Sequence, residues 1–305
     1  MSRSAPARPP RSGSTRRRRQ REQRRPWVGY AAAAIVLVLA VFVAARLIMG
    51  NTQPTPADAP VSPELMTTLT TVPVEALNQV GRGTVTNPPQ AIHGQPVAMS
   101  ESGLPLITYI GAEWCPYCAG ERWPMIIALS RFGTLENVST SASSSSDVYP
   151  STPTFTFHGS TYTSSYISFV PVETQSNVRS GNSFQTLATP TTAQESLIET
   201  YDAPPYVPAQ SAGSIPFVDF ANQYMISGAS YDVGVLQGQT RDQIAANLSK
   251  PSSPQAQAIL GSANAITAAI CATTNSQPAE VCSQPGVAAF ASGTSGGTPT
   301  SAPSQ

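Results

Sequence analysis

Apolar and polar positions along residues 64–290 follow patterns that predict short strands and helices. A run rich in β-branched residues at 104–110 predicts a buried strand, and the mostly apolar segment 119–129 predicts a helix soon after it. Two later segments, 213–220 and 222–228, predict a strand, a tight turn and a second strand. The other predicted elements are an edge strand at 91–97, a strand at 135–140, helices opened by capping boxes at 192–201 and 240–248, and a last helix at 254–272.

Residues 154–162 and 166–170 alternate between apolar and polar with period two, which predicts a β-hairpin. His158-Gly159-Ser160 is predicted to form the turn of this hairpin, so His158 is expected to be exposed to solvent. The aromatic side chains on these segments are expected to form a core rather than a ligand site: Phe155, Phe157, Tyr162, Tyr166 and Phe169.

Charge divides the chain unevenly, although the formal net charge is zero. Residues 1–26 hold ten of the 17 basic residues and one of the 17 acidic ones, so the remainder is acidic. The next 18 uncharged residues, 28–45, span about 27 Å as a helix, close to the hydrocarbon core of a bilayer. We therefore predict a transmembrane helix at 27–49, with the basic tail in the cytoplasm and the rest outside.

Two alternatives compete with the membrane anchor. Residues 28–45 also fit a cleaved signal peptide, since Val43-Ala44-Ala45 is a passable cleavage site. The arginine run also fits a nucleic-acid-binding tail, but its place directly before an apolar span favours a topology signal and no nucleic-acid partner. After the span, a Pro-rich linker is predicted at 50–63, a folded domain at 64–290 and a disordered tail at 291–305.

Cys115-Pro116-Tyr117-Cys118 follows the predicted strand and opens the predicted helix. Free backbone N–H groups and the helix dipole stabilise a thiolate at such a position, so Cys115 is expected to be reactive. Cys118 lies three residues on, where it can close a small disulfide ring.

This unit resembles the thioredoxin superfamily. Trp114-Cys115 and its lead-in look like thioredoxin, and Pro116-Tyr117 looks like glutaredoxin. Pro124 lies where many thioredoxins have a kinking proline, and Ile215-Pro216 lies where the family has a cis-proline beside the cysteines. Residues 60–285 look most like prokaryotic membrane-anchored thioredoxin-like proteins that carry only a domain-of-unknown-function label.

The resemblance implies an α/β fold with a thioredoxin-like mixed sheet flanked by helices. It implies that Cys115 is the nucleophile and Cys118 the resolving cysteine, with Trp114 shielding the thiolate and Tyr117 tuning its pKa and contact surface. Ile215 is expected to offer backbone hydrogen bonds to an extended substrate.

Two departures from the family stand out. Thioredoxins have a buried Asp six residues before the first cysteine, where this chain has Tyr109. Glu113 or Glu121 is a substitute proton acceptor, although solvated positions are expected for both. The 98 residues from Cys118 to Pro216 predict a Ser/Thr/Tyr-rich insertion with a β-hairpin at about 139–213.

Cys271 and Cys282 have ten residues between them and are predicted to form a structural disulfide. A second redox pair is the alternative, but no strand–helix junction surrounds them. A Cys₄ zinc site is not expected, because only one of the two pairs is closely spaced. His93, at the predicted edge strand, is expected at the surface.

The sequence thus predicts a membrane-anchored extracytoplasmic thiol–disulfide oxidoreductase. It would need no cofactor or metal and would act on cysteine-containing exported proteins with a membrane or extracytoplasmic redox partner. The direction stays open between oxidase, isomerase and reductase. The alternatives are a non-catalytic binding or adaptor module with a structural CxxC disulfide, and a Cu(I) carrier that binds through the same two cysteines.

Overall fold

The computed structural model describes residues 59–291. The predicted basic tail (1–26), the predicted membrane span (27–49), most of the linker (50–63) and nearly all of the tail (291–305) lie outside the described residues.

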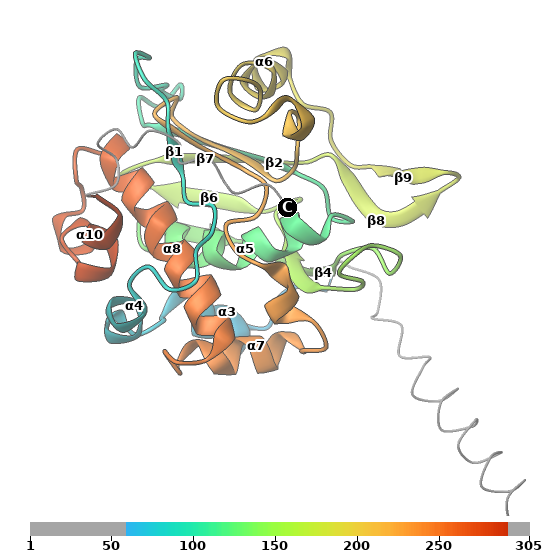
Figure 1. Ribbon diagram of the computed structural model, residues 1–305, viewed down its shortest axis with the longest axis horizontal. Coiled ribbons are helices and arrows are strands. Elements are labelled where there is room, and N and C mark those ends of the chain that lie inside the picture. The colour runs from blue at the N-terminus through green and yellow to red at the C-terminus, as the bar shows by residue number, and fades with distance from the viewer. Residues whose placement is uncertain (1–58, 292–305) are drawn as a thin grey trace, which may run out of the picture. The chain divides into compact units, whose positions relative to one another are not determined.

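A five-stranded mixed sheet in the order β1-β11-β10-β2-β7 forms the centre of the described fold (Figure 1). Strand β2 (Leu106–Gly111) pairs in parallel with β7 (Ser168–Glu173) and antiparallel with β10 (Phe217–Phe220). Strand β11 (Tyr224–Ser227) follows β10 through a tight turn, as predicted, and the short β1 (Gln90–Ala91) pairs with β11 at the edge. The prediction of a mixed α/β sheet flanked by helices is confirmed.

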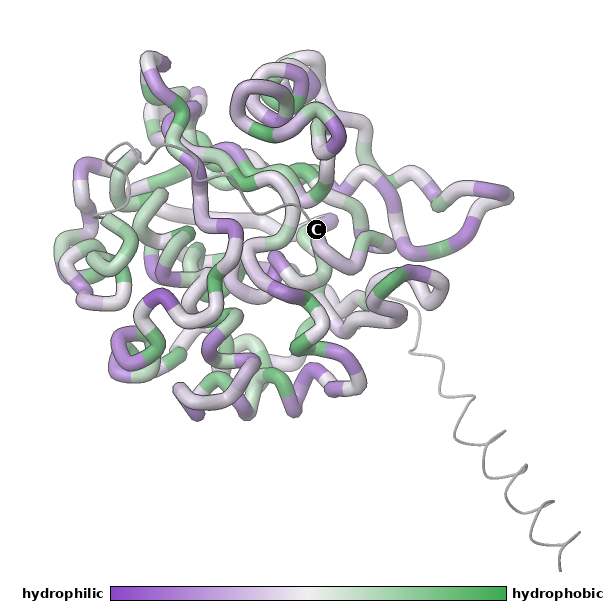
Figure 2. The backbone as a smooth tube through the Cα atoms, in the orientation of Figure 1, coloured by the Kyte–Doolittle hydropathy of each residue, from purple (hydrophilic) through white to green (hydrophobic). Residues whose placement is uncertain are grey.

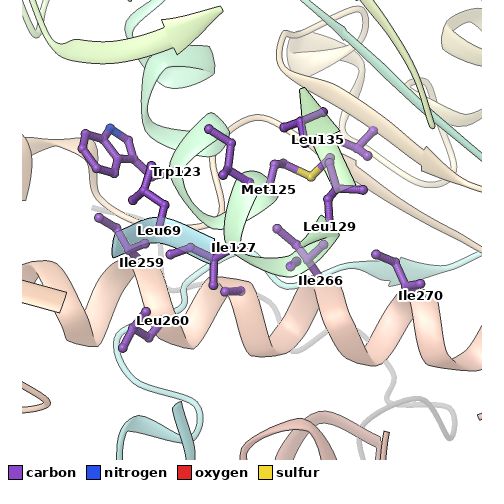
Figure 3. Close-up of a cluster of buried hydrophobic side chains, with 14 of the residues drawn as sticks. Leu69, Trp123, Met125, Ile127, Leu129, Leu135, Ile259, Leu260, Ile266 and Ile270 are labelled. Carbon is purple, nitrogen blue, oxygen red and sulfur yellow. The ribbon is translucent and has the colours of Figure 1, made fainter. Parts of the chain in front are cut away.

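Helices cover both faces of this sheet (Figure 1). Helices α5 (Pro116–Leu129) and α8 (Pro254–Thr273) pack together on one face and form the larger apolar core. Figure 3 shows α5 residues such as Met125 and Leu129 lying over Ile266 of α8. Helix α6 (Thr192–Tyr201) covers the other face over a smaller core.

Helix α8 is the one helix among the described residues that is long and apolar enough to cross a membrane. Its most apolar 18-residue stretch is 83% buried within the protein, so α8 is a helix of the hydrophobic core. The helix predicted at 254–272 is therefore confirmed, but it is not the last one, because short helices follow it at 279–282 and 285–291.

The predicted hairpin across 154–170 is wrong. Strand β5 (Pro153–Thr156) pairs with β4 (Ser139–Ala142), whereas β6 (Thr161–Ser164) pairs with β3 (Gly133–Glu136). The turn at His158 therefore joins strands of two different small sheets, and His158 itself is exposed as expected. The aromatic side chains were correctly assigned to the core, since Phe155, Phe157 and Phe169 are buried and Tyr162 and Tyr166 pack against them.

The region predicted as an insertion, 139–213, contains β7 and thus contributes a strand to the central sheet. Next to β7, strands β8 (Gln175–Ser180) and β9 (Ser183–Thr186) form a hairpin that projects from the body of the fold (Figure 1). Figure 2 shows polar residues at the tip of this hairpin.

The remaining elements fill the periphery. Thr191 rather than Thr192 caps α6, one residue before the predicted cap, and the predicted capping box at Thr240 is confirmed. The other bounds are α3 (Pro63–Thr70), α4 (Val74–Val80), η1 (Ala209–Ser211), η2 (Val233–Leu236), α7 (Arg241–Leu248), α9 (Ala279–Cys282) and α10 (Pro285–Ala291).

Candidate functional site

The two cysteines lie where β2, an interior strand of the sheet, is followed by α5. Cys115 is the N-cap residue of α5, and its sulfur accepts a hydrogen bond from the backbone N–H of Cys118 at 3.3 Å. Pro116 occupies the first helical position, where its missing N–H leaves no intrahelical bond unmade. Strand and helix thus place both sulfur atoms at an N-terminus that favours negative charge.

Both cysteines are free thiols with little exposed surface, 3% for Cys115 and 0% for Cys118. Hydrogen bonding from the Cys118 thiol, helped by the nearby backbone N–H groups and the charge of Arg122, lowers the pKa of Cys115. Burial raises the pKa of Cys118 well above its ordinary value. The pair is therefore asymmetric, with Cys115 the one that ionises first.

The peptide bond between Ile215 and Pro216 is cis, and this dipeptide lies beside the dithiol. The thiol of Cys115 donates to the carbonyl oxygen of Ile215 at 3.6 Å. Ile215 also packs against a small buried cluster that contains both cysteines. Two segments 100 residues apart in the chain are therefore brought together, as the resemblance to thioredoxins implied.

Trp114 lies beside Cys115 and is held by the β8–β9 hairpin. Its indole N–H donates to the side-chain oxygen of Gln175 at 2.9 Å, and its ring stacks on Phe184 with centroids 5.3 Å apart. The backbone carbonyl of Trp114 also accepts from the N–H of Ser144 at 2.8 Å. Segments of the 139–213 region thus cover the dithiol.

Tyr117 is the exposed member of the motif, with 43% of its surface accessible. Its ring meets Tyr149, from the loop between β4 and β5, edge to face with centroids 6.0 Å apart. Val148 beside Tyr149 is also exposed. An aromatic and apolar surface therefore borders the dithiol.

Beneath the dithiol, α5 carries a buried ion pair that the sequence analysis missed. Arg122 donates twice to the carboxylate of Glu173 at the end of β7, and its Nη2 also donates to the carbonyl of Ala112 at 2.8 Å. Glu173 accepts a further bond from the N–H of Phe157. The sequence signal that could have revealed this pair is the charged doublet Glu121-Arg122 inside an otherwise apolar helix.

Glu113 and Glu121 are both buried, so the expectation of solvated carboxylates is wrong. Glu121 accepts from the N–H and the hydroxyl of Ser230, at 2.8 and 2.7 Å. Burial raises the pKa of Glu121 to about 7. The sequence placed Glu121 on the predicted helix but did not reveal its partner. Ser230 comes from a distant loop, and its two hydrogen bonds offset part of the cost of burying the carboxylate.

The second cysteine pair is a disulfide, as predicted, joining Cys271 at the end of α8 to Cys282. His93 is exposed, as expected. Within residues 59–291, no cluster of three or more His, Cys, Asp or Glu side chains forms a candidate metal site.

The comparison with family models gives one match. Residues 90–272 match a family described as a domain of unknown function (DUF929). This segment includes the dithiol, Trp114 and Ile215-Pro216. No curated protein and no solved structure matches the chain.

Proposed function

The chain belongs to the DUF929 family, whose description defines no activity, and from the chemistry of the site we propose that it catalyses thiol–disulfide exchange through Cys115 and Cys118. The observation that carries this proposal is the placement of both cysteines at one helix N-terminus, where Cys115 is the N-cap residue and its sulfur accepts from the Cys118 N–H at 3.3 Å; the lowered pKa of Cys115 and the raised pKa of Cys118 agree with it. A low-pKa cysteine beside a resolving cysteine is the arrangement that disulfide exchange requires.

The reaction proceeds in two steps. The Cys115 thiolate attacks one sulfur of a substrate disulfide, forming a mixed disulfide and releasing the other substrate sulfur as a thiolate, which takes up the Cys118 proton in the next step. Cys118 then loses its proton and attacks the Cys115 sulfur, which closes the Cys115–Cys118 disulfide and releases the second substrate sulfur. The substrate gains two electrons and the dithiol loses two; the reverse sequence oxidises a substrate.

Several features support a thioredoxin-like arrangement for this chemistry. The dithiol follows β2, an interior strand of the mixed sheet, and the cis Ile215–Pro216 peptide lies beside Cys115. The carbonyl of Ile215 points at the reactive sulfur, where a bound substrate chain would run. We take Tyr117 and its aromatic neighbour Tyr149 as the contact surface for the substrate protein.

We further propose that the protein acts outside the cytoplasm as a single-pass membrane protein. Its support is the uncharged segment 28–45 behind ten arginines, together with the Cys271–Cys282 disulfide, a bond that persists in oxidising compartments. Cysteine-containing exported proteins would be the substrates, and a membrane or extracytoplasmic protein would exchange electrons with the dithiol.

A second function, a binding module with a permanently closed CxxC disulfide, is favoured by one observation. Cys115 is only 3% exposed, beneath the cover formed by Trp114 and Phe184. In that case the protein would bind partners without exchanging electrons with them.

The reduction potential of the Cys115/Cys118 pair separates the two functions. The full chain is equilibrated in graded glutathione buffers, its thiols are trapped by alkylation, and the modified cysteines are located by mass. A reversible transition at roughly −120 to −270 mV is expected for a catalytic dithiol, and its value indicates the favoured direction. A disulfide that resists reduction below about −300 mV would overturn the catalytic proposal in favour of the binding module.

Variants make the chemical step specific. Cys115→Ser is expected to abolish exchange with a disulfide-bonded test protein, and Cys118→Ser is expected to accumulate the mixed disulfide at Cys115. The double variant Cys271→Ala/Cys282→Ala is the matched control, since it removes two cysteines remote from the dithiol and should exchange at the wild-type rate. Exchange at the wild-type rate in Cys115→Ser would exclude the mechanism.

A further inference from the structure

Two buried hydrogen-bond donors beneath the dithiol have no partner. They are the hydroxyl group of Tyr109, on β2, and the Nη1 atom of Arg122, on α5. Both side chains are completely buried. Because a buried donor without an acceptor costs stability, such atoms call for a chemical explanation.

Both donors lie close to the peptide that joins Gly111 to Ala112. The Tyr109 hydroxyl lies against Gly111 so closely that a Cβ atom on this glycine would come within 2.3 Å of the hydroxyl oxygen. Arg122 reaches the adjoining peptide, between Ala112 and Glu113, through Nη2, which donates to the Ala112 carbonyl at 2.8 Å. The Cζ atom of Arg122 also lies 5.9 Å from the centroid of the Tyr109 ring, so the two side chains are neighbours.

The sulfur of Cys118 lies at this peptide too. Burial raises its pKa, while the charge of Arg122 and the backbone N–H of Ala112 act in the opposite direction. Cys118 and Arg122 are four residues apart on α5, so they occupy the same face of the helix. The resolving sulfur and the two unpartnered donors are thus gathered in one buried site.

Neither donor is suited to accept a proton. Burial raises the pKa of Tyr109 well above its ordinary value, so its hydroxyl stays protonated. Burial alone would lower the pKa of Arg122, but the charge of Glu173 overrides this, and its pKa is raised, so it remains a cation. Both groups keep their protons and have an N–H or O–H to donate, and a suitable acceptor for two such donors is an anion.

Resting on the proposed function, we infer that Tyr109 and Arg122 stabilise the Cys118 thiolate that forms when this cysteine attacks the mixed disulfide. In that step the Cys118 proton leaves for the thiolate that the substrate has already released. The Tyr109 O–H and the Arg122 Nη1–H then face a full negative charge on the Cys118 sulfur. When the Cys115–Cys118 bond forms, that charge leaves with the second substrate sulfur, which is released as a thiolate, and the donors return to their unpartnered state.

The ionisable groups around Cys118 come from several elements. Cys115 and Arg122 lie on α5, Tyr109 lies on β2, and Glu173 at the end of β7 faces Arg122. Glu113, buried in the loop before Cys115, adds a further carboxylate to this region. Each test variant therefore changes one of these groups and is compared with a control in which the others are the same.

The test uses Tyr109→Phe, which removes the hydroxyl and keeps the ring. Tyr231→Phe is its matched control, because Tyr231 is another buried tyrosine, and its hydroxyl donates to the Gly120 carbonyl on the same helix. Both changes are made in the full chain, and retention of the fold is checked by circular dichroism.

The first measurement is the pKa of Cys118 in a Cys115→Ser background, where Cys118 is the one thiol left outside the Cys271–Cys282 disulfide. The NMR shift of the labelled cysteine Cβ carbon is followed against pH. Tyr109→Phe is expected to raise the pKa of Cys118 by about one unit, and Tyr231→Phe is expected to leave it unchanged. This measurement requires no disulfide exchange.

The second measurement separates the two steps of exchange with all four cysteines present. Tyr109→Phe should form the mixed disulfide at the wild-type rate but resolve it about threefold more slowly, because the roughly tenfold loss of thiolate is partly offset by the greater nucleophilicity of a thiolate with a higher pKa. If the wild type exchanges disulfides while Tyr109→Phe changes neither the pKa nor the resolution rate, the inference is overturned and the proposed function stands. If the wild type fails to exchange, the proposed function fails, and the inference with it, whatever the pKa measurement gives.

Arg122→Lys provides a second variant should Tyr109→Phe not fold. Lysine retains the positive charge opposite Glu173 but has no Nη1 donor. The expected result is again a raised Cys118 pKa and slower resolution with unchanged formation of the mixed disulfide. Resolution at the wild-type rate in a folded Arg122→Lys protein would contradict the role given to Nη1.

Discussion

Arg122 and Glu173 form a two-pronged ion pair, with N–O distances of 2.7 and 2.6 Å, in which neither side chain is exposed to solvent. The pair joins the helix that carries the dithiol to the edge strand β7 of the sheet. Both charges lie inside the protein, so each depends on the other to offset the cost of leaving water.

Breaking this pair should strongly destabilise the fold. Glu173→Gln leaves the Arg122 cation buried without a countercharge, and the expected loss is about 3–5 kcal/mol of unfolding free energy. Urea denaturation measures the loss, with the exposed Glu136→Gln on β3 as the control. Replacing both partners, as Arg122→Met/Glu173→Leu, should cost less than Glu173→Gln alone; an equal or larger loss would contradict the account of an uncompensated charge.

Stability should fall between about pH 4.5 and 7 because of Glu121. Its pKa is about 7 in the folded protein against 4.5 ordinarily, so over this interval the unfolded chain has released the proton that the folded protein still binds. Glu121 alone then lowers the unfolding free energy by about 3 kcal/mol as the pH rises, with no further change above its folded pKa. Asp219, whose pKa burial also raises to about 7, acts in the same direction.

Glu121→Gln tests this pH dependence. The amide can still accept a hydrogen bond from Ser230, but it does not titrate. The fall in unfolding free energy with rising pH should therefore be smaller by the part due to Glu121, and the part due to Asp219 should remain. Denaturation at several pH values measures the slope, and Glu199→Gln, an exposed position on α6, should leave it as in the wild type. An unchanged slope in Glu121→Gln would show that the carboxylate titrates normally.

Access to Cys115 should depend on the stack between Trp114 and Phe184. Phe184→Ala removes the ring that holds Trp114 in place, so alkylation of Cys115 by a bulky reagent should become severalfold faster. Val178→Ala, on the same hairpin at a position 49% exposed, is the control and should leave the rate unchanged. Equal rates in both variants would mean that the hairpin does not limit access.

The Cys271–Cys282 disulfide should contribute to stability and not to exchange. Removing both cysteines as Cys271→Ala/Cys282→Ala frees a short loop in the unfolded chain, and the expected cost is about 3 kcal/mol. The urea midpoint measures this cost. The reduction potential of the Cys115/Cys118 pair should stay as in the wild type, and a shift would indicate that the two pairs are coupled.

The parts of the site that the sequence predicted are those set by neighbouring residues. An apolar run before Cys115 and a helix after it place the dithiol at a strand–helix junction. The spacing of Cys271 and Cys282 likewise suffices for a disulfide. These features depend on local backbone geometry, which a single segment of sequence determines.

The features that the sequence analysis missed depend on partners far along the chain. Period-two alternation identified β5 and β6 as strands but could not show that they pair with β4 and β3 rather than with each other. In the same way, charge alone suggested solvent for Glu121, because Ser230 is brought to it only by the folded chain.

Residues from three other parts of the chain bind α5 on different sides through hydrogen bonds and an ion pair. Glu121 is bound by Ser230, Arg122 by Glu173, and the carbonyl of Ala119 accepts from the hydroxyl of Thr154 at 2.7 Å. Rotation of α5 about its own axis would break all three interactions at once. The helix therefore holds the sulfur atoms of Cys115 and Cys118 in a fixed position. Exposure of Cys115 to a substrate must therefore come from a displacement of Trp114 and Phe184, and not from a movement of α5.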